Sequence, residues 1–275
     1  MLGRCLQSLA DQSYREFEVV VCDGLSTDRT VAEAEQWAAL LPGLLVDSQR
    51  DGGIYQGINR GIKLSRGRWI LVLGADDRIA GPDALAAVAQ TLETTAARFV
   101  YGDVVTAAAN SWGPAGTRYP GAVDASGLLS TNICQQSVFY RRDLFDSHGL
   151  FRPEYRVCAD WDMALRVAGT EAIEWMDVIV AEYAATGMSA RTIDHKFKHD
   201  RPLLVATMIL KRPLDGRFFG ARYALATYSR EALRDGDRKL HALWFWSTAQ
   251  WLALIGALRG RIRRGDGTVA SGRRG

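Results

Sequence analysis

Two adjacent carboxylates follow an apolar run in the stretch WILVLGADDR, residues 69–78. Neighbouring charges of one sign repel each other and lose solvation, so Asp76 and Asp77 favour a cation or a hydrogen-bonding ligand between them. Carboxylate oxygens are ligands that suit Mg²⁺ or Mn²⁺, which is commonly bound by one or two acids together with substrate phosphates. The alternative is that one of the two acids caps the helix predicted after Pro82.

Two more aspartates lie at the ends of predicted strands. Asp23 closes the β-branched run FEVVVCD, residues 17–23, and Asp103 lies toward the end of RFVYGDVV, residues 98–105. Ligands of open α/β sheets bind beyond the carboxyl ends of the strands. We therefore expect Asp23, Asp103 and the pair at 76–77 to share the rim of one crevice.

The segment DGGIYQGINRGI, residues 51–62, has too many glycines for an ordinary helix, yet its isoleucines recur every four residues. Gly53, Gly57 and Gly61 share that spacing and permit close approach of backbone or ligand. Arg60 and Lys63 can meet phosphate charge. The segment matches neither the dinucleotide fingerprint nor the P-loop, so its motif alone is weak.

Alternating strands and helices position these residues. Helices are predicted at about 2–9, 30–41, 82–95 and 160–168, and strands at 17–23, 44–49, from 69 onward, 98–105 and 173–183. The stretch ICQQSVFYRRDLF predicts a strand that enters a short helix closed by Gly149. Such alternation indicates βαβ units. The predicted fold class is α/β, a mostly parallel sheet flanked by helices, with a C-terminal helical appendage.

Composition narrows the class of protein. A chain of 275 residues with 48% hydrophobic content can bury the core of one large α/β domain with an appendage. The four cysteines have no CxxC spacing, which favours a reducing compartment over secretion or a structural zinc site. Residues 1–9 contain no long apolar run, so we expect no signal peptide and a cytoplasmic protein.

The charge of the chain is divided unevenly. Residues 1–195 contain 17 basic and 25 acidic residues, a net −8, whereas residues 196–275 contain 17 and 6, a net +11. The second part carries clustered aromatic residues and then four arginines: Trp244, Phe245, Trp246, Trp251, Arg259, Arg261, Arg263 and Arg264. This pattern is typical of a helix lying on an anionic membrane surface. A helical hairpin packed on the α/β domain, or a dimer interface, is the alternative; nucleic acid is disfavoured because the basic excess lies in an apolar tail.

The motifs together resemble the family 2 glycosyltransferases, inverting enzymes with a GT-A fold. They occur in family order across residues 2–190: SLADQSYREFEVVVCDGLSTDRT, RDGGIYQGINRGIKLSRGRWILVLGADD, QQSVFYRRDLF and CADWDMALR. The chain is most similar to members that build bacterial surface polysaccharides on lipid-linked acceptors. The resemblance implies a catalytic domain at 1–195 and a tail at 196–275 that associates with the inner membrane.

The resemblance also implies roles for individual residues. Asp160 falls at the general base, Asp77 at the divalent metal (Mn²⁺ or Mg²⁺), and Asp76 at the ribose. Asp23, Asp51 and Asn59 fall on the side of the nucleoside diphosphate sugar donor. The acceptor side, for a lipid-linked or glycan acceptor, takes Gln136, Arg141, Trp161 and Asp162, with Gln135 standing where relatives often have a histidine. A helix N-cap is the alternative for Asp160, and a core position is the alternative for Trp161.

Two departures from the family pattern bear on the nucleotide site. The family begins with an apolar strand, and this sequence begins in the helix after it, so either translation starts further upstream or the nucleotide site is incomplete. Gly74 replaces the first acid of the usual acidic motif. Two other functions therefore stay open: a nucleotidyltransferase of the same fold class and a non-catalytic nucleotide- or sugar-binding module.

Overall fold

The structure is a computed structural model that describes residues 1–110, 112–124, 126–184, 187–211, 221–234, 243–252 and 254. The helices within these residues are α1 (Leu2–Ala10), α2 (Thr30–Glu35), α3 (Ile54–Leu64), α4 (Ala84–Thr94), α5 (Leu144–His148), α6 (Ala159–Ala168), α7 (Met188–Arg191), α8 (His195–Lys211) and α9 (Ala221–Arg234). The strands are β1 (Val19–Asp23), β2 (Leu44–Ser48), β3 (Trp69–Leu71), β4 (Arg78–Ile79), β5 (Phe99–Thr106), β6 (Arg118–Tyr119), β7 (Val138–Arg141) and β8 (Ile173–Tyr183). The predicted α/β class is confirmed.

Residues 1–48 contain a small parallel sheet and two helices. β1 and β2 pair in parallel, with Val19 opposite Leu44 and Asp23 opposite Ser48. α1 and α2 cover this pair, and Leu6, Ala34 and Leu41 form the buried centre between them. The β-branched run of β1 and the crossover through α2 make this the βαβ unit that the sequence predicts.

The larger sheet has the strand order β3-β7-β5-β8-β4, and β6 pairs with β5. Among the described strand pairs, β1 with β2 and β5 with β8 are parallel, and four pairs are antiparallel. The prediction of a mostly parallel sheet is therefore wrong in strand direction. After α4 the chain no longer returns through a crossover helix before each strand, so β6 and β7 enter beside β5 from the opposite direction.

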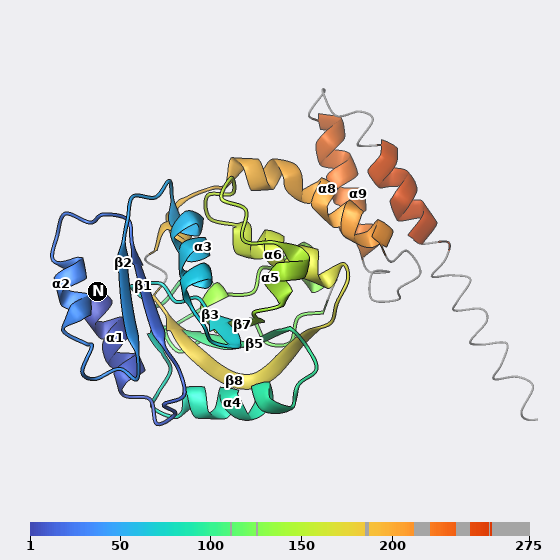
Figure 1. Ribbon diagram of the computed structural model, residues 1–275. Helices are drawn as coiled ribbons and strands as arrows, with labels where there is room; N and C mark the ends of the chain where they lie inside the picture. The colour runs from blue at the N-terminus through green and yellow to red at the C-terminus, as the bar shows by residue number, and fades with distance from the viewer. Residues whose placement is uncertain are drawn as a thin grey trace, which may run out of the picture.

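Helices cover both faces of the larger sheet. α4 lies along one face beneath β8, where Val88 packs with Val100 and Val180. α5 and α6 lie against the other face, and α8 and α9 pack outside α6 (Figure 1). Because β5 is covered on both sides, seven of its eight residues are buried. This central strand is the rigid support for the segments that carry the polar residues.

Asp103 lies inside β5 and not at its end. β5 and β8 shift register around Gly102, whose Cβ, were one present, would lie 2.4 Å from the carbonyl oxygen of Val178. The Asp103 carboxylate is fully buried, accepts a hydrogen bond of 3.0 Å from Trp175 Nε1 and pairs with Arg118. The expectation that Asp103 shares the crevice rim is wrong, because β5 continues to Thr106.

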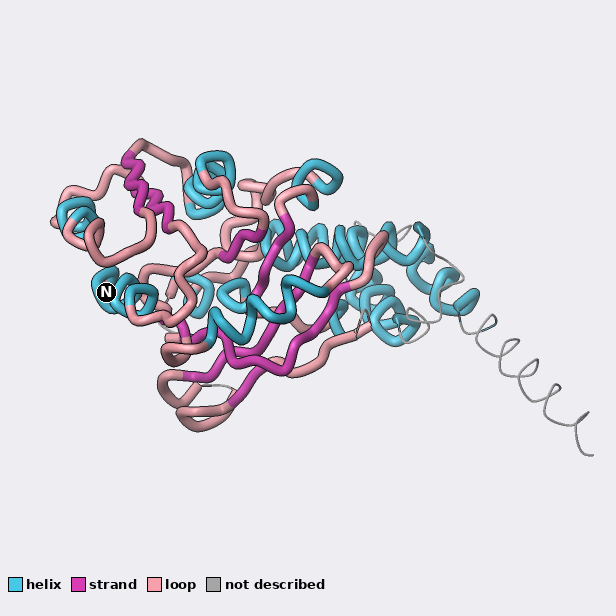
Figure 2. The backbone as a smooth tube through the Cα atoms, turned by 60° about the horizontal axis from the view of Figure 1, so that its bottom comes forward, coloured by secondary structure: helices cyan, strands magenta, loops and turns pink. Residues whose placement is uncertain are grey.

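An apolar slot separates the two sheets. Within the described part of the chain, β1 pairs only with β2 and β3 pairs only with β7, and Figure 2 shows the small sheet apart from the longer strands. A cavity of about 710 Å³ lies between them, lined by apolar side chains such as Leu6, Val20, Ile70 and Val88. The slot lies beside β1, whose residues Val19 to Cys22 line it.

Candidate active site

One cavity brings together three of the predicted acids. It has a volume of about 340 Å³ and is bordered by α3, the turn after β3, residues 132–136, the start of α6, Tyr183, Gly187 and Met188. Asp76, Asp77 and Asp160 all line it. Asp76 and Asp77 are contributed by the edge of the sheet, whereas Asp160 comes from a helix, so the acids approach the cavity from different elements.

Asp77 is buried and firmly held. Its Oδ2 accepts a hydrogen bond of 2.9 Å from Gln136 Nε2, and its Oδ1 accepts one of 3.2 Å from the backbone N–H of Ala184. The pKa of Asp77 is raised to about 6, chiefly by burial and also by the charge of Asp76, against the opposing effect of these hydrogen bonds. The carboxylate therefore has a fixed orientation at the wall of the cavity.

Gly74 makes room for this pair of acids. A Cβ at position 74 would lie 2.8 Å from Asp77 Oδ2 and 3.0 Å from Asp76 Oδ1. The carboxylate oxygens of both acids thus gather over the glycine, a donor set that fits Mg²⁺ or Mn²⁺. No cluster of three or more His, Cys, Asp or Glu residues is found in the described residues. A cation here would therefore take its other ligands from substrate phosphates and water.

Asp160 is the second residue of α6 and lies almost entirely out of solvent. Its Oδ1 accepts a hydrogen bond of 3.0 Å from the Tyr55 hydroxyl, and its Oδ2 accepts one of 2.9 Å from Asn132 Nδ2. Burial raises the pKa of Asp160, and these two donors oppose the rise. The N-cap of α6 is Cys158, so the capping alternative for Asp160 does not describe this helix.

The donor-side acids lie in a separate group at the end of β1. Asp23 accepts hydrogen bonds from the backbone N–H of Ser26 at 3.0 Å and from Ser48 Oγ at 2.5 Å, and these bonds lower its pKa. Asp51 lies across from it, with Oδ2 3.1 Å from the position of a Cβ on Gly24. Neither Asp23 nor Asp51 lines the cavity of Asp160, so the predicted acids fall into two separate groups.

Residues of α3 mainly fasten this helix in place. Asn59 donates to the carbonyl oxygen of Phe151 at 2.7 Å and accepts from the N–H of Phe151 at 3.1 Å. Both polar atoms of its side-chain amide are therefore hydrogen-bonded to the backbone of one residue. Arg60 pairs with Asp47 and, at 3.8 Å, with Asp51. A Cβ on Gly61 would lie 3.2 Å from Cys22 Sγ. The glycine spacing thus allows the close approach of α3 to β1.

Of the four residues predicted for the acceptor side, Gln136 lines the cavity and the other three do not. Trp161 donates through Nε1 to the carbonyl oxygen of Leu128 at 2.7 Å. Asp162 is fully buried between Arg152 and Arg166, at 3.1 Å and 2.9 Å.

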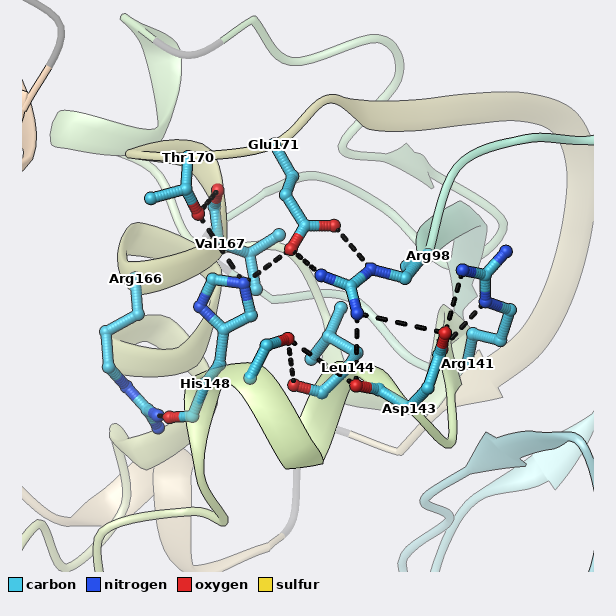
Figure 3. A network of polar contacts seen from close by, with 10 residues as sticks. Arg98, Arg141, Asp143, Leu144, His148, Arg166, Val167, Thr170 and Glu171 are labelled. Carbon is cyan, nitrogen blue, oxygen red and sulfur yellow. Dashed lines mark hydrogen bonds and ion pairs between the residues drawn. The ribbon is translucent and has the colours of Figure 1, made fainter.

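Arg141 lies at the far end of β7. It pairs with Asp143 at 2.8 Å, beside a network in which Arg98 and His148 both pair with Glu171 (Figure 3). This network joins β5, β7, α5 and the end of α6, and it is away from the cavity lining. Arg141 thus lies beside the ion pairs that connect these strands and helices and does not line the cavity.

Sequence reasoning missed two kinds of residue at the cavity. Tyr55 and Asn132 hold Asp160, although Tyr55 stood within the glycine-rich motif. Trp112 stacks on Tyr119 at 4.0 Å and on Tyr183 at 5.0 Å between ring centroids, and all three rings line the cavity. Trp112 and Tyr119 are close in the sequence, but Tyr183 comes from the distant end of β8, so no local motif could have grouped all three.

The aromatic tail is only partly described. Phe245 is buried and packs near Tyr228 of α9, whereas Trp246 and Trp251 are 53% and 39% exposed. Within the part of the chain that the structure describes, no helix is long and apolar enough to cross a membrane. The four arginines at 259, 261, 263 and 264 lie outside the described residues.

Comparison with known proteins identifies the family. The family model described as Glycosyl transferase family 2 matches residues 1–149, which is more than half of the chain. The chain belongs to glycosyltransferase family 2. A PGL/p-HBAD biosynthesis glycosyltransferase of Mycobacterium bovis is 40% identical over 209 residues, which are 74% of this chain and 79% of that relative. A chondroitin synthase of Escherichia coli is 35% identical over 82 residues, 30% of this chain and 12% of the relative.

Solved structures show the same fold. TarS of S. aureus in complex with UDP-GlcNAc has a TM-score of 0.67 at 21% identity, covering 90% of this chain and 75% of that one. The mannosyltransferase PcManGT from Pyrobaculum calidifontis, in complex with GDP-Man and Mn²⁺, has a TM-score of 0.52 at 19% identity, covering 92% and 81%. The predicted GT-A fold is confirmed, and the family 2 protein is a glycosyltransferase enzyme. This family assignment speaks against the nucleotidyltransferase and the non-catalytic module.

Proposed function

We propose that this glycosyltransferase moves a sugar, with inversion, from a nucleoside diphosphate sugar to a hydroxyl of a lipid-linked or glycan acceptor. One observation carries the proposal: the buried carboxylate of Asp160 faces the same cavity as the adjacent acids Asp76 and Asp77. Direct displacement needs a base for the attacking hydroxyl and charge stabilisation for the leaving diphosphate. Asp160 is proposed to serve as the base, and Asp76 and Asp77 to provide the charge stabilisation through a bound cation.

The donor is assigned to the side of β1 and the turn after β3. Asp23 is proposed to contact the base of the nucleotide and Asp76 its ribose, with Asp51 on the same donor side. Asp76 lines the cavity that Asp160 also lines. Structures of the same fold were obtained with UDP-GlcNAc and with GDP-Man and Mn²⁺, which supports a nucleotide sugar as donor.

Asp77, with Asp76 beside it, is the proposed holder of Mn²⁺ or Mg²⁺. A divalent cation at this place supplies positive charge to the departing diphosphate. Gln136 and the N–H of Ala184 fix the Asp77 carboxylate before any ligand binds. Because Gly74 has no side chain, the oxygens of both acids stay directed toward one point.

Asp160 is the proposed general base. Its carboxylate takes the proton of the acceptor hydroxyl while that oxygen attacks the anomeric carbon, so the attack comes from the face opposite to the leaving diphosphate. A buried carboxylate with a raised pKa is a stronger base than one in water. Single direct attack inverts the configuration.

The acceptor is proposed to reach the enzyme at the cytoplasmic surface of the inner membrane. The helical residues 243–252 leave Leu243 and Trp246 exposed, at positions one turn apart, and the segment 196–275 has a net charge of +11. Exposed tryptophan with basic charge favours an anionic lipid surface. Such a surface would present a lipid-linked acceptor to the cavity.

The test is a transfer assay with the full chain, a panel of UDP- and GDP-sugars, Mn²⁺ and a bacterial lipid extract as acceptor. Release of nucleoside diphosphate and the anomeric configuration of the product are measured. Asp160→Asn and Asp77→Asn should each lower transfer by at least about a hundredfold, because one loses the base and the other a charged ligand.

The exposed Asp146→Asn is the matched control and should keep wild-type transfer. Circular dichroism checks that each variant is folded. Wild-type transfer by folded Asp160→Asn would refute the role of the base, and retention of configuration would refute the direct displacement.

A further inference from the structure

Two donors from distant parts of the chain hold the two oxygens of Asp160. Tyr55 is the second residue of α3 and donates to Oδ1, and Asn132 precedes the turn 135–137 and donates to Oδ2. Each oxygen therefore has one donor of its own, which fixes the plane of the carboxylate. The remaining lone pairs are left for a ligand in the cavity that Asp160 lines.

The Tyr55 hydroxyl is itself rigidly placed. Its side chain is 5% exposed, and its ring lies 5.6 Å from that of Phe151 between centroids. Asn59 binds the backbone of the same Phe151, one turn further along α3. Contacts other than the hydrogen bond to Asp160 therefore fix the position of the Tyr55 side chain.

Asn132 is oriented by Asp160 alone. Its Nδ2 points to the carboxylate, whereas its Oδ1 is buried with no hydrogen-bond partner. Tyr119 holds the backbone carbonyl of Asn132 through a hydrogen bond of 2.9 Å. The reverse orientation of the amide would set a carbonyl oxygen against a carboxylate oxygen, and a buried unpaired acceptor is costly, so the contact with Asp160 is what keeps this arrangement.

We propose that Tyr55 and Asn132 are positioning residues that hold the carboxylate of Asp160 in the orientation in which it takes the acceptor proton. The inference rests on the proposed role of Asp160 as the general base. A second consequence concerns its charge: hydrogen bonds from a phenol and an amide are stronger to the ionised carboxylate than to the neutral acid. The two donors therefore keep Asp160 ionised despite its burial.

Other titratable groups around Asp160 do not replace these donors. The groups packed around it are Tyr55 of α3, Tyr140 of β7, Cys134 before β7 and Cys158 before α6, and each has a pKa raised by burial. These four are neutral near neutral pH. Asp76 and Asp77 line the same cavity, and negative charge on them opposes the ionisation of Asp160. Arg201 of α8 and Asp194 act on Cys158 with opposite signs. Among the described residues Asp160 has no ion pair. The side chains that favour its ionised form are Asn132 and Tyr55, and the backbone N–H groups of Trp161 and of Asp160 itself act in the same direction.

The test measures the maximal rate of the full-length enzyme against pH, at saturating donor and with the acceptor extract of the transfer assay. Tyr55→Phe removes only the hydroxyl, and Asn132→Asp replaces the amide donor by a second carboxylate. Each should move the acid limb of the profile to higher pH by about one unit, so the rate falls about tenfold on that limb and recovers at alkaline pH. The KM for the donor should stay unchanged.

Tyr228→Phe is the matched control, because it removes another buried hydroxyl, one that donates to the carbonyl oxygen of Leu129. It should leave the profile where it is. A rate that falls equally at every pH in Tyr55→Phe and Asn132→Asp, or a profile identical to wild type, would overturn the positioning role. If Asp160→Asn loses transfer while Tyr55→Phe and Asn132→Asp keep the wild-type profile, the positioning role fails and the proposed function stands. If Asp160→Asn keeps full transfer, the proposed function itself is refuted.

Discussion

Asp23 shows how a single carboxylate that is proposed to bind the donor also contributes to folding. The hydrogen bonds from Ser26 and Ser48 lower its pKa below the ordinary 3.8, so they stabilise the ionised, folded form. A depressed pKa contributes stability that is complete above the ordinary value and is lost as the pH falls through the lower, folded value. Ser48→Ala should therefore lower the free energy of unfolding by about 1 kcal/mol at neutral pH.

Urea denaturation over a series of pH values measures this effect. The difference between Ser48→Ala and wild type should shrink as the pH falls below 3.8, because the carboxylate becomes protonated in both states. Ser130→Ala is the control, since Ser130 Oγ donates to a backbone carbonyl and to no carboxylate. A difference that persists unchanged in acid would show that Ser48 acts through packing instead.

The slot between β1 and β3 is the main unusual feature at the scale of elements. Ala89 of α4 lines it, whereas Ala86 on the same helix does not. Ala89→Leu adds apolar volume to a cavity of about 710 Å³ and should raise the free energy of unfolding by about 1 kcal/mol. Ala86→Leu is the control and should change it less.

Thermal and urea unfolding of the two variants answer whether the slot is empty in the folded protein. If another segment occupies it, Ala89→Leu overpacks the interior and costs about 1–3 kcal/mol. A loss of stability in Ala89→Leu alone would therefore contradict an open slot. It would indicate that the sheet is continuous from β1 to β3.

Some elements follow from sequence and others do not. The βαβ unit of β1, α2 and β2 was predictable because apolar runs and turn residues mark each element locally. The antiparallel entry of β7 was not, because strand direction depends on the path of the chain between β5 and β7 and no local pattern marks that path. The acids at 76–77 and at 160 carried recognisable motifs. Tyr55, which donates a hydrogen bond to Asp160, is 105 residues away from it in the sequence, so only the folded structure reveals that contact.

At the scale of the whole molecule, the aromatic tail extends the core of the catalytic part and also presents apolar side chains to solvent. Tyr228 of α9 donates to the carbonyl oxygen of Leu129 at 3.0 Å, and Phe245 is buried beside it. α8 packs on α6, the helix of Asp160. α8 begins at His195, next to the boundary predicted between residues 195 and 196.

The exposed Trp246 and Trp251 should bind the full chain to anionic membranes. We expect sedimentation with vesicles that contain phosphatidylglycerol, and little with phosphatidylcholine alone, because residues 196–275 carry a net charge of +11. Trp246→Ser with Trp251→Ser should lower the bound fraction on the order of tenfold, since the tryptophan rings would enter the headgroup region. Added salt should weaken binding by screening.

Leu40→Ser is the control, because Leu40 is as exposed as Trp246 but lies after α2, at the other side of the molecule (Figure 1). It should sediment with vesicles like wild type. Analytical ultracentrifugation without lipid tests the alternative of a dimer interface. That alternative holds if the wild-type protein is a dimer that does not bind vesicles and the double tryptophan variant is a monomer. The surface of Trp246 and Trp251 would then be a contact between two copies of the chain. Equal binding to neutral and anionic vesicles would instead remove the electrostatic part of the argument and leave only the apolar contact.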